Sequence, residues 1–355
     1  MRTPRVPKFT RAVADRAPLL ERPSWDDTSA TTTTKVPQPG RRPEVDQVDR
    51  DLIALLTANG RTTNRALAAE VGLTEPTVAA RVRSLANLRV LGVTATLDWA
   101  AAGYTWDAWL QVSVKGRPVK EVGAELASLD VVHLVNLVFG PFDLLVHILL
   151  ADESAAIDVI DRQIGGIRGV YAVRPSVTLE TIKFETKHAR IPIRPIRLSF
   201  PNPVIDLDPL DFALINALVG DGRQSNREAA RNLGVSEGTV RVRLRRMEEA
   251  GLLRITARSD PYLTGELNAW ATIGVATERG ASRSVAGQLA AMSETTIVTL
   301  LAGAEDILAS VATATRSRLV DLVLEEVRAI TGVRSTATWD LVSTATLSYQ
   351  WARLL

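Results

Sequence analysis

The sequence has 355 residues, 46% of them hydrophobic, so two to four domains with real hydrophobic cores are expected. It contains no cysteine, which excludes disulfides, thiolate zinc sites and cysteine nucleophiles, and its three histidines are too scattered for a histidine metal cluster. The net charge of +2 neither requires nor forbids a nucleic-acid partner.

Residues 1–43 form a basic arm. They are rich in Pro, Thr and Arg, show no hydrophobic periodicity, and carry a net charge of +5 from nine basic and four acidic side chains. This composition predicts a disordered segment that adds non-specific, salt-sensitive affinity for DNA. The arm lacks the apolar core of a signal peptide, and with the absence of cysteine this favours a cytoplasmic location.

Residues 44–98 predict a helix-turn-helix domain of three short helices and a strand. The first helix has leucine and isoleucine at helical spacing and ends at Asn59-Gly60, a C-cap signal. A turn at Gly72 separates the second helix from the third, for which Thr74 is a good N-cap. The elements after the first helix are expected at Thr63–Val71, from Thr74 onward, and as an extended wing or connector strand at Val90–Leu97.

In residues 99–185, stretches with the pattern of β-strands are mixed with helical stretches, and their order predicts a ferredoxin-like β-α-β-β-α-β domain. The expected elements in chain order are Trp106–Val114, Val119–Leu129, Val131–Phe139, Leu144–Leu150, Ala155–Ile164 and Val170–Leu179. The apolar stretch 131–151 is long enough to be mistaken for a membrane helix. Because it contains Gly140-Pro141 and Asp143, two β-strands explain it better than a bilayer span, and no membrane association is expected.

The chain then repeats itself. Sliding it by 162 positions places residues 46–98 on 208–260 without a gap, with 20 identities in 53 positions. A period this long indicates a duplicated domain unit. The remaining segments are predicted as a Pro-rich connector (186–203), a second helix-turn-helix domain (204–260), a second ferredoxin-like domain (261–345) and a tail (346–355). The expected fold class is therefore α+β, with two winged helix-turn-helix domains alternating with two ferredoxin-like domains in an internal tandem duplication.

Several motifs recur in both halves. An Asp-x-x-Asp helix start is followed by Gly-Arg before the second helix, then by Thr/Ser-x-x-Thr-Val in the third, and later by a Gly-x-x-Asp turn between strands. This order resembles the Lrp/AsnC (feast/famine) family of transcriptional regulators over residues 46–184 and 208–345. The resemblance implies that the helix-turn-helix binds double-stranded DNA. It also implies that the ferredoxin-like domain pairs into homo-oligomers and senses amino acids or related metabolites.

The third helices carry the candidate DNA-reading face. Val78, Val82 and Leu85 define the buried side of the first copy, so its opposite side carries a single arginine, whereas the second copy carries three. Arg241 and Arg245 are the best candidates for base edges, because a guanidinium can bond two acceptors of guanine. The predicted DNA-binding residues are Thr74, Thr77, Arg81, Arg83, Ser236, Thr239, Arg241, Arg243, Arg245 and Arg246. The alternative is a solvated face with no DNA contact.

Other polar residues near this face have open roles. Arg246 suits a phosphate as well as a base, and Arg81 and Arg243, on the flank of the buried side, suit phosphate better. Arg61 and Arg223 fit either phosphate contact or bracing of the fold. Asn64 and Asn226 are interpreted as helix caps. The hypothesis is that the second copy carries most of the affinity and the first copy is mainly positional.

The Gly-x-x-Asp turns are the candidate effector sites by resemblance to the family. They comprise Gly140, Asp143, Gly303 and Asp306, and a carboxylate there could hold the amino group of an amino acid. The alternative is structural: glycine permits the tight turn and aspartate caps it.

Two other functions are weighed. Tandem domains of this architecture also occur in sirohaem decarboxylases, whose clefts use histidines and arginines. This chain has no His-Asn-x-x-Arg cluster. His133 and His147 are expected in the core or an interface. A co-regulator that acts through protein contacts is the third alternative. The favoured interpretation is a DNA-binding transcriptional regulator with no catalytic activity and no cofactor.

Overall fold

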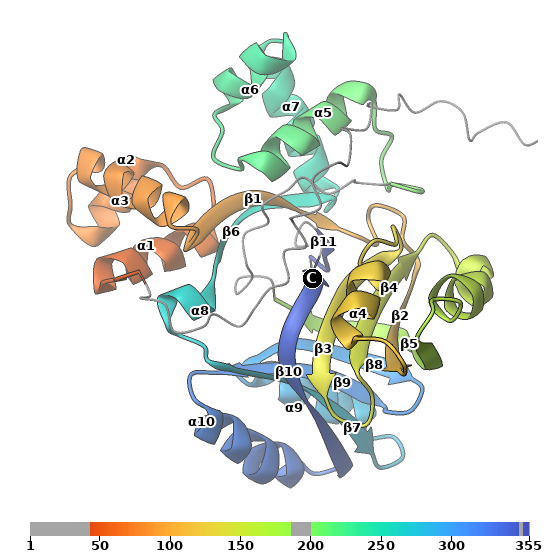
Figure 1. Cartoon of the computed structure of the whole chain (residues 1–355). Helices are drawn as coiled ribbons and strands as arrows, with labels where there is room; N and C mark the ends of the chain where they lie inside the picture. The colour runs from red at the N-terminus through yellow and green to blue at the C-terminus, as the bar shows by residue number, and fades with distance from the viewer. Residues whose placement is uncertain (1–42, 186–199, 348–350, 355) are drawn as a thin grey trace, which may run out of the picture. The chain divides into compact units, whose positions relative to one another are not determined.

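The computed structural model describes residues 43–185, 200–347 and 351–354 (Figure 1). The arm at 1–43 lies almost entirely outside the described residues, as does most of the predicted connector. Helices and strands are mixed along the described chain, which confirms the α+β class. None of its helices combines the length and apolar character that a membrane span requires.

The first helix-turn-helix consists of α1 (Gln47–Ala58), α2 (Asn64–Val71) and α3 (Glu75–Asn87). Each helix begins where a short polar side chain caps it: Asp46 forms a capping box with Asp49, and Thr63 and Thr74 accept from backbone amides of the first turns of α2 and α3. Helix α2 ends at Gly72, whose φ of +67° suits glycine. The apolar sides of all three helices share one buried cluster.

The second helix-turn-helix repeats this arrangement in α5 (Pro209–Gly220), α6 (Asn226–Leu233) and α7 (Glu237–Glu249). Its caps are Asp208, Ser225 and Ser236. In both copies the residue that caps the second helix, Thr63 or Ser225, lies one position before the asparagine that the sequence suggested as the cap. The assignment of Asn64 and Asn226 as caps is therefore wrong.

A three-stranded sheet joins the two helix-turn-helix units. Strands β1 (Leu91–Asp98) and β6 (Leu253–Ser259) pair antiparallel, with Thr94 directly opposite Thr256, its counterpart at the 162-residue offset. The strand β11 (Trp351–Ala352) pairs parallel with β1. The segment predicted as a tail therefore contains a strand, and the Trp351 side chain is buried in the core of the second helix-turn-helix.

Eight strands close into a barrel in the order β10-β3-β4-β2-β5-β8-β9-β7. The strands are β2 (Trp106–Val114), β3 (Val132–Phe139), β4 (Leu144–Leu150), β5 (Val170–Phe184), β7 (Ala269–Thr277), β8 (Thr295–Ala302), β9 (Ile307–Thr313) and β10 (Val333–Leu347). The helical segments are α4 (Val119–Leu126), η1 (Glu153–Ala155), η2 (Asp158–Ile164), α8 (Pro261–Thr264), α9 (Ser282–Ala291), α10 (Arg316–Asp321) and η3 (Leu322–Val327). The stretch 131–151 forms the hairpin β3–β4, as predicted.

The barrel differs from the expectation of two separate ferredoxin-like domains. Strand β5 pairs with β2 and then with β8, and β10 pairs with β7 and then with β3, so each long strand crosses into the other half. This crossing explains why β5 and β10 extend beyond the predicted ends at 179 and 341. One face of the strands packs on the helices in two clusters, and the other face encloses an aromatic cluster that includes Trp109, Phe142 and Trp339.

Candidate nucleic-acid interface and effector sites

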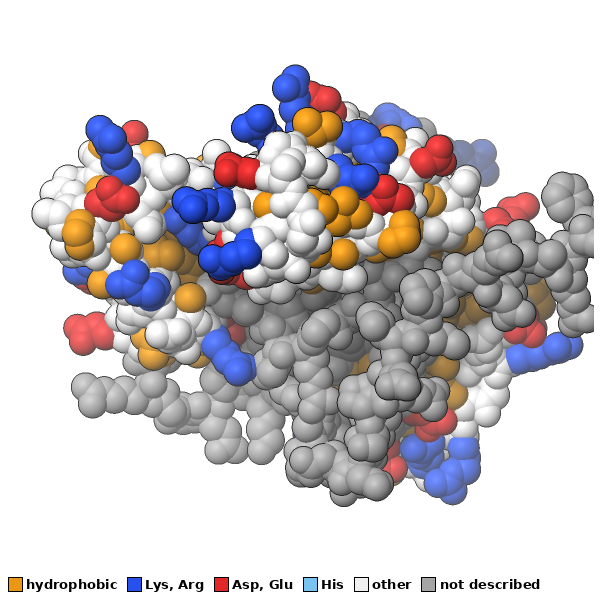
Figure 2. Space-filling view, turned by 90° about the horizontal axis from the view of Figure 1, so that it is seen from above, with side chains coloured by type: hydrophobic (Ala, Val, Ile, Leu, Met, Phe, Trp, Pro, Cys, Tyr) orange, Lys and Arg blue, Asp and Glu red, His pale blue; other side chains and the backbone are white. Residues whose placement is uncertain are grey.

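The outer faces of α3 and α7 differ as the sequence predicted. Helix α3 exposes Ala80, Arg83 and Ser84, whereas α7 exposes Arg241, Val242, Arg245 and Arg246. Figure 2 shows Lys and Arg side chains spread over the helix-turn-helix face with Asp and Glu between them. Two of the α7 arginines have acidic neighbours: Arg245 Nε lies 2.7 Å from Glu249 Oε1, and Arg246 Nη2 lies 2.5 Å from Asp211 Oδ2. The pair with Glu249 lies on the surface, and its hydrogen bond raises the pKa of Arg245. Because a surface ion pair contributes little free energy, another anion could replace the carboxylate.

Arg81 and Arg243 are engaged inside their own domains. Arg81 Nη1 lies 2.8 Å from Asp46 and 2.9 Å from Asp49, and Arg243 Nη1 lies 2.7 Å from Asp208 and 2.9 Å from Asp211. The hydrogen bond from Arg243 is the main cause of the lowered pKa of Asp208. These arginines tie the third helix to the capping box of the first, so a phosphate contact would compete with that pair.

Arg61 and Arg223 connect the two helix-turn-helix units. Arg61 Nη1 donates to Asn226 Oδ1 at 2.7 Å, and Arg223 Nη2 donates to Asn64 Oδ1 at 2.9 Å. Each arginine also donates to a backbone carbonyl of the opposite unit, Gln224 or Gly60. We call these reciprocal bonds the cross-brace. Of the two roles left open by the sequence, the structure gives these arginines the bracing one.

The cross-brace has a measurable energy. In a double-mutant cycle with Arg61→Ala and Asn226→Ala, we expect a coupling free energy of about 1–2 kcal/mol. Asn226→Ala leaves the half-buried Arg61 guanidinium without this acceptor, and Arg61→Ala leaves the Asn226 oxygen without this donor. Urea unfolding of the full chain measures it. Arg61→Ala combined with Asn64→Ala is the matched control, and equal couplings in the two cycles would contradict the pairing.

The small polar residues at the start of the third helices form caps. Thr74 Oγ1 and Thr77 Oγ1 are 2.8 Å apart, and Ser236 Oγ and Thr239 Oγ1 are also 2.8 Å apart. Thr74 and Ser236 are the N-caps, and Thr77 and Thr239 are their partners in the first turn. Thr74, Thr77 and Ser236 are exposed, and Thr239 is partly exposed. Thr74 and Ser236 therefore cap their helices, as the sequence suggested, and phosphate contact by these hydroxyls stays a prediction.

The predicted effector turns use their carboxylates structurally. Asp143 Oδ2 accepts from the Val114 amide at 2.7 Å, and Asp306 Oδ2 accepts from the Thr277 amide at 2.6 Å. In both halves the aspartate thus holds the end of the strand beside its turn. These bonds give Asp143 and Asp306 a structural role at the neighbouring strand rather than within their own turns, and an amino group would have to share these carboxylates.

The glycines of the two turns have different neighbours. A Cβ on Gly140 would lie 3.1 Å from the Trp339 ring, whereas a Cβ on Gly303 would lie 2.5 Å from Ser176 Cβ. Ser176 and Trp339 occupy corresponding positions on β5 and β10, so each turn packs against the long strand of the other half. The two turns are therefore not equivalent.

Glu305, beside the second turn, has an unfavourable environment for its charge. Burial raises its pKa above the ordinary 4.5, against an opposing hydrogen bond from Gln111 Nε2 at 2.9 Å. A carboxyl group whose pKa is higher in the folded than in the unfolded protein favours the folded state when it is protonated. This contribution is fully present below the unfolded-state pKa and is lost as the pH rises through the folded-state pKa.

We therefore expect Glu305→Gln to be more stable than the parent chain at neutral pH, with the difference disappearing as the pH falls below 4.5. Chemical unfolding over a pH series measures this. The exposed Glu325→Gln is the control, and a pH-independent difference for Glu305→Gln would argue against burial as the cause.

The histidines of the barrel are buried and bonded to each other. His133 Nδ1 and His147 Nδ1 are 2.9 Å apart, and His147 Nε2 lies 2.9 Å from Asp107 Oδ2. Trp109 stacks on His147 at 4.4 Å. This confirms the prediction that both are core histidines. No group of histidines and carboxylates in the described part of the chain has the arrangement of a metal site.

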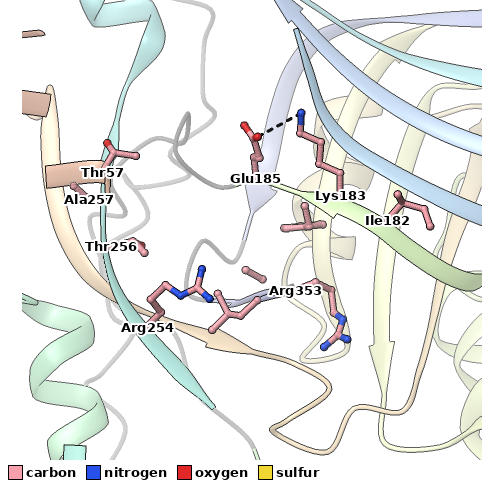
Figure 3. Close-up of a pocket in the computed structure, with 11 residues that line it drawn as sticks. Thr57, Ile182, Lys183, Glu185, Arg254, Thr256, Ala257 and Arg353 are labelled. Atoms are coloured by element: carbon pink, nitrogen blue, oxygen red, sulfur yellow. Dashed lines mark ion pairs between the residues drawn. The ribbon is translucent and has the colours of Figure 1, made fainter. Parts of the chain in front are cut away.

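Sequence reasoning missed a pocket between the barrel and the sheet of β1, β6 and β11 (Figure 3). We call it the junction pocket; its volume is about 320 Å³. It is lined by Thr57, Ile182, Lys183, Phe184, Glu185, Arg254, Thr256, Ala257, Ala352, Arg353 and Leu354. These residues lie in or next to α1, β5, β6 and β11. Because these elements are far apart in the chain, no local sequence motif could have identified the pocket.

Three protein-family models match separate parts of the chain. The AsnC-type helix-turn-helix domain matches residues 45–86, and the Lrp/AsnC ligand binding domain matches residues 107–187. A winged helix-turn-helix DNA-binding domain matches residues 207–254. These matches cover both helix-turn-helix units and the first four strands of the barrel.

Curated relatives are regulators of about half this length. An uncharacterised HTH-type transcriptional regulator of Pyrococcus furiosus is 36% identical over 144 residues, which are 40% of this chain and 97% of that regulator. The leucine-responsive regulatory protein of Rhizobium meliloti is 30% identical over 146 residues, which are 40% of this chain and 94% of that protein.

Among solved structures, the sirohaem decarboxylase NirDL is similar along most of both chains. The match has a TM-score of 0.60 and covers 84% of this chain and 92% of the decarboxylase. The sequence identity is 14%, so this likeness concerns the fold alone.

Proposed function

The chain belongs to the Lrp/AsnC family of transcriptional regulators, and we propose on that premise that it is a cytoplasmic, sequence-specific DNA-binding regulator that responds to an amino acid or related metabolite. The observation that carries the DNA-binding part is the exposed arginine face of α7, in a helix-turn-helix unit whose core and caps are complete. Such a face suits the major groove, where arginine distinguishes guanine.

We propose unequal roles for the two reading helices. Arg241 and Arg245 of α7 contact base edges, and Arg246 contacts phosphate or a base. Helix α3, with Arg83 alone, mainly positions its unit on the backbone, with help from Thr74 at its start, and Ser236 contacts a phosphate at the start of α7. Arg81 and Arg243 act first as internal braces, because both are held by two carboxylates.

We also propose that the chain arose by tandem duplication and works as a covalent pseudo-dimer. The gapless repeat, the recurring element order and the reciprocal cross-brace support this. Fused halves can diverge, so the operator is expected to have two unlike half-sites about 34 Å apart. Footprinting of bound genomic sites tests this, and a clean palindrome would contradict it.

Effector response and assembly are the remaining parts of the proposal. A metabolite that binds one arrangement of the chain better than another would shift the helix-turn-helix spacing or the formation of homo-oligomers. Genomic footprinting repeated with and without amino acids in the medium tests the response. Unchanged occupancy in both media would remove the effector from the proposal, and an absence of protected DNA would remove the regulator.

The shared fold keeps a decarboxylase-like enzyme as the second candidate. We favour the regulator because His133 and His147, the histidines in the described part of the chain, are buried and bonded to each other and do not line the junction pocket. A visible absorption spectrum of the protein incubated with a tetrapyrrole separates the two, since a bound tetrapyrrole would shift its absorption bands.

A further inference from the structure

We propose that Val242 of α7 contacts the C5-methyl group of a thymine in the half-site bound by the second helix-turn-helix, and so selects thymine at one position of the operator. This inference rests on the proposed function and adds an apolar specificity-determining residue to the arginines of the reading helix. The position of Val242 on α7, the surface beside it and its counterpart in the first copy support the contact.

Val242 lies at the centre of the outer face of α7. The buried residues of this helix are Val240, Leu244 and Met247. At about 100° per residue, Val242 lies within about 15° of the direction opposite to the mean of these three, whereas Arg241 and Arg245 lie about 90° and about 45° from it. When this face enters the major groove, the side chain at its centre is therefore valine, with these two arginines on one flank.

The surface beside Val242 suits a DNA duplex. Val242 is 66% exposed and borders a depression of about 490 Å³. The residues that line this depression are Asp208, Gly238, Thr239, Val242, Arg243 and Arg246. Figure 2 shows hydrophobic surface among the Lys and Arg side chains of the helix-turn-helix face. The methyl group of thymine is the apolar group that a base pair presents in the major groove, and the surrounding guanidiniums complement the phosphates.

Gly238, one turn before Val242, leaves room for a base pair to approach. A Cβ at Gly238 would have only the Ser236 hydroxyl within 4 Å, at a distance of 3.6 Å, so packing within the described ranges does not require glycine here. Glycine weakens a helix relative to alanine, and a close approach of the backbone to a ligand is one reason for its use. The open space above Gly238 lies next to the proposed methyl contact.

The first copy lacks both features. At the 162-residue offset, Ala80 corresponds to Val242 and Pro76 corresponds to Gly238. The alanine side chain is two carbons shorter in content than valine and reaches less far from the helix. The proline ring occupies the space that glycine leaves open. We therefore assign the thymine contact to the second copy, in agreement with the two unlike half-sites proposed for the operator.

Replacement of thymine by uracil tests the contact, because deoxyuridine differs from thymidine only by the loss of the C5-methyl group. Each thymine of a footprinted operator is replaced in turn, and binding to the full chain is measured by fluorescence anisotropy at fixed salt. At least one replacement should weaken binding about threefold to fivefold, as expected for the loss of one buried methyl group. Val242→Ala should weaken binding to the thymine operator by a similar factor and should bind that uracil operator equally well.

Val320→Ala is the matched control. Val320 is an exposed valine on α10, outside both helix-turn-helix units, and its exposed fraction is 44%. This variant loses the same two carbons from the surface as Val242→Ala. It should bind the thymine and uracil operators with the affinities of the parent chain.

Three outcomes would overturn the inference. If no uracil replacement weakens binding, or if Val242→Ala shows the same thymine–uracil difference as the parent chain, the contact is wrong while the regulator stands, because binding to the thymine operator is measured separately. If Val242→Ala retains that difference and sediments as a smaller assembly, the exposed valine belongs to a protein interface. A chain that protects no DNA would remove the regulator and this inference together.

Discussion

Arg241→Ala should bind operator DNA at least about tenfold more weakly than the parent chain, because one two-bond contact to guanine contributes roughly 1–3 kcal/mol of discrimination. The Arg241 side chain is exposed on the outer face of α7, and the buried residues of that helix, Val240, Leu244 and Met247, face the core. The loss should be larger for the true operator than for random DNA, because a base contact is specific to sequence. Fluorescence anisotropy at fixed salt with both DNAs measures it.

The matched variant is Arg83→Ala on α3. We expect it to weaken binding by no more than about threefold and equally for operator and random DNA, because a phosphate contact carries no sequence information. Arg162→Ala, on a helical segment of the barrel, is the surface control. Equal losses for Arg241→Ala and Arg83→Ala would contradict the unequal roles of the two reading helices.

Trp339→Ala should lower the free energy of unfolding by about 3–5 kcal/mol, the usual loss for truncating a large buried aromatic side chain. Trp339 is 2% exposed, packs edge-on against Phe142 with ring centroids 4.9 Å apart, and covers the Gly140 turn. Since β10 pairs with strands of both halves, the cavity would weaken the barrel at the point where the halves meet.

Urea unfolding followed by circular dichroism measures this loss. Tyr171→Ala, at an aromatic residue that is 66% exposed on β5, is the control and should change the free energy by less than about 0.5 kcal/mol. A loss below about 1 kcal/mol for Trp339→Ala would mean that the barrel interior tolerates an empty space, contrary to its close packing.

Much of the fold could be predicted because its signals are local. Caps such as Thr74, glycine stops such as Gly72 and the alternation in 106–114 are signals within single elements, and the structure has the helices and strands at these positions. The repeat then allowed the helices and strands of the second half to be predicted from those of the first, because similar sequence patterns favour similar secondary structure. The contrast between the outer faces of α3 and α7 also follows from helical periodicity alone.

The remaining features depend on partners distant in sequence. Arg81 could be placed on the flank of α3, but its carboxylate partners belong to α1, and only the tertiary fold brings them within 3 Å. Arg61 donates a hydrogen bond to Asn226, which lies in the other half of the chain. The extra length of β5 and β10 likewise reflects pairing across the halves, which alternation within a strand does not reveal.

The closure of the barrel also determines when this protein can fold during synthesis. Strand β10 pairs with β3, which precedes it by about two hundred residues, so the sheet edge at β3 stays open until the ribosome has released β10. The first helix-turn-helix can close its own core much earlier, since that cluster is built almost wholly from residues 45–91. A nascent chain stalled before β10 should therefore present an unpaired β3 edge to chaperones, although its first reading domain is already formed.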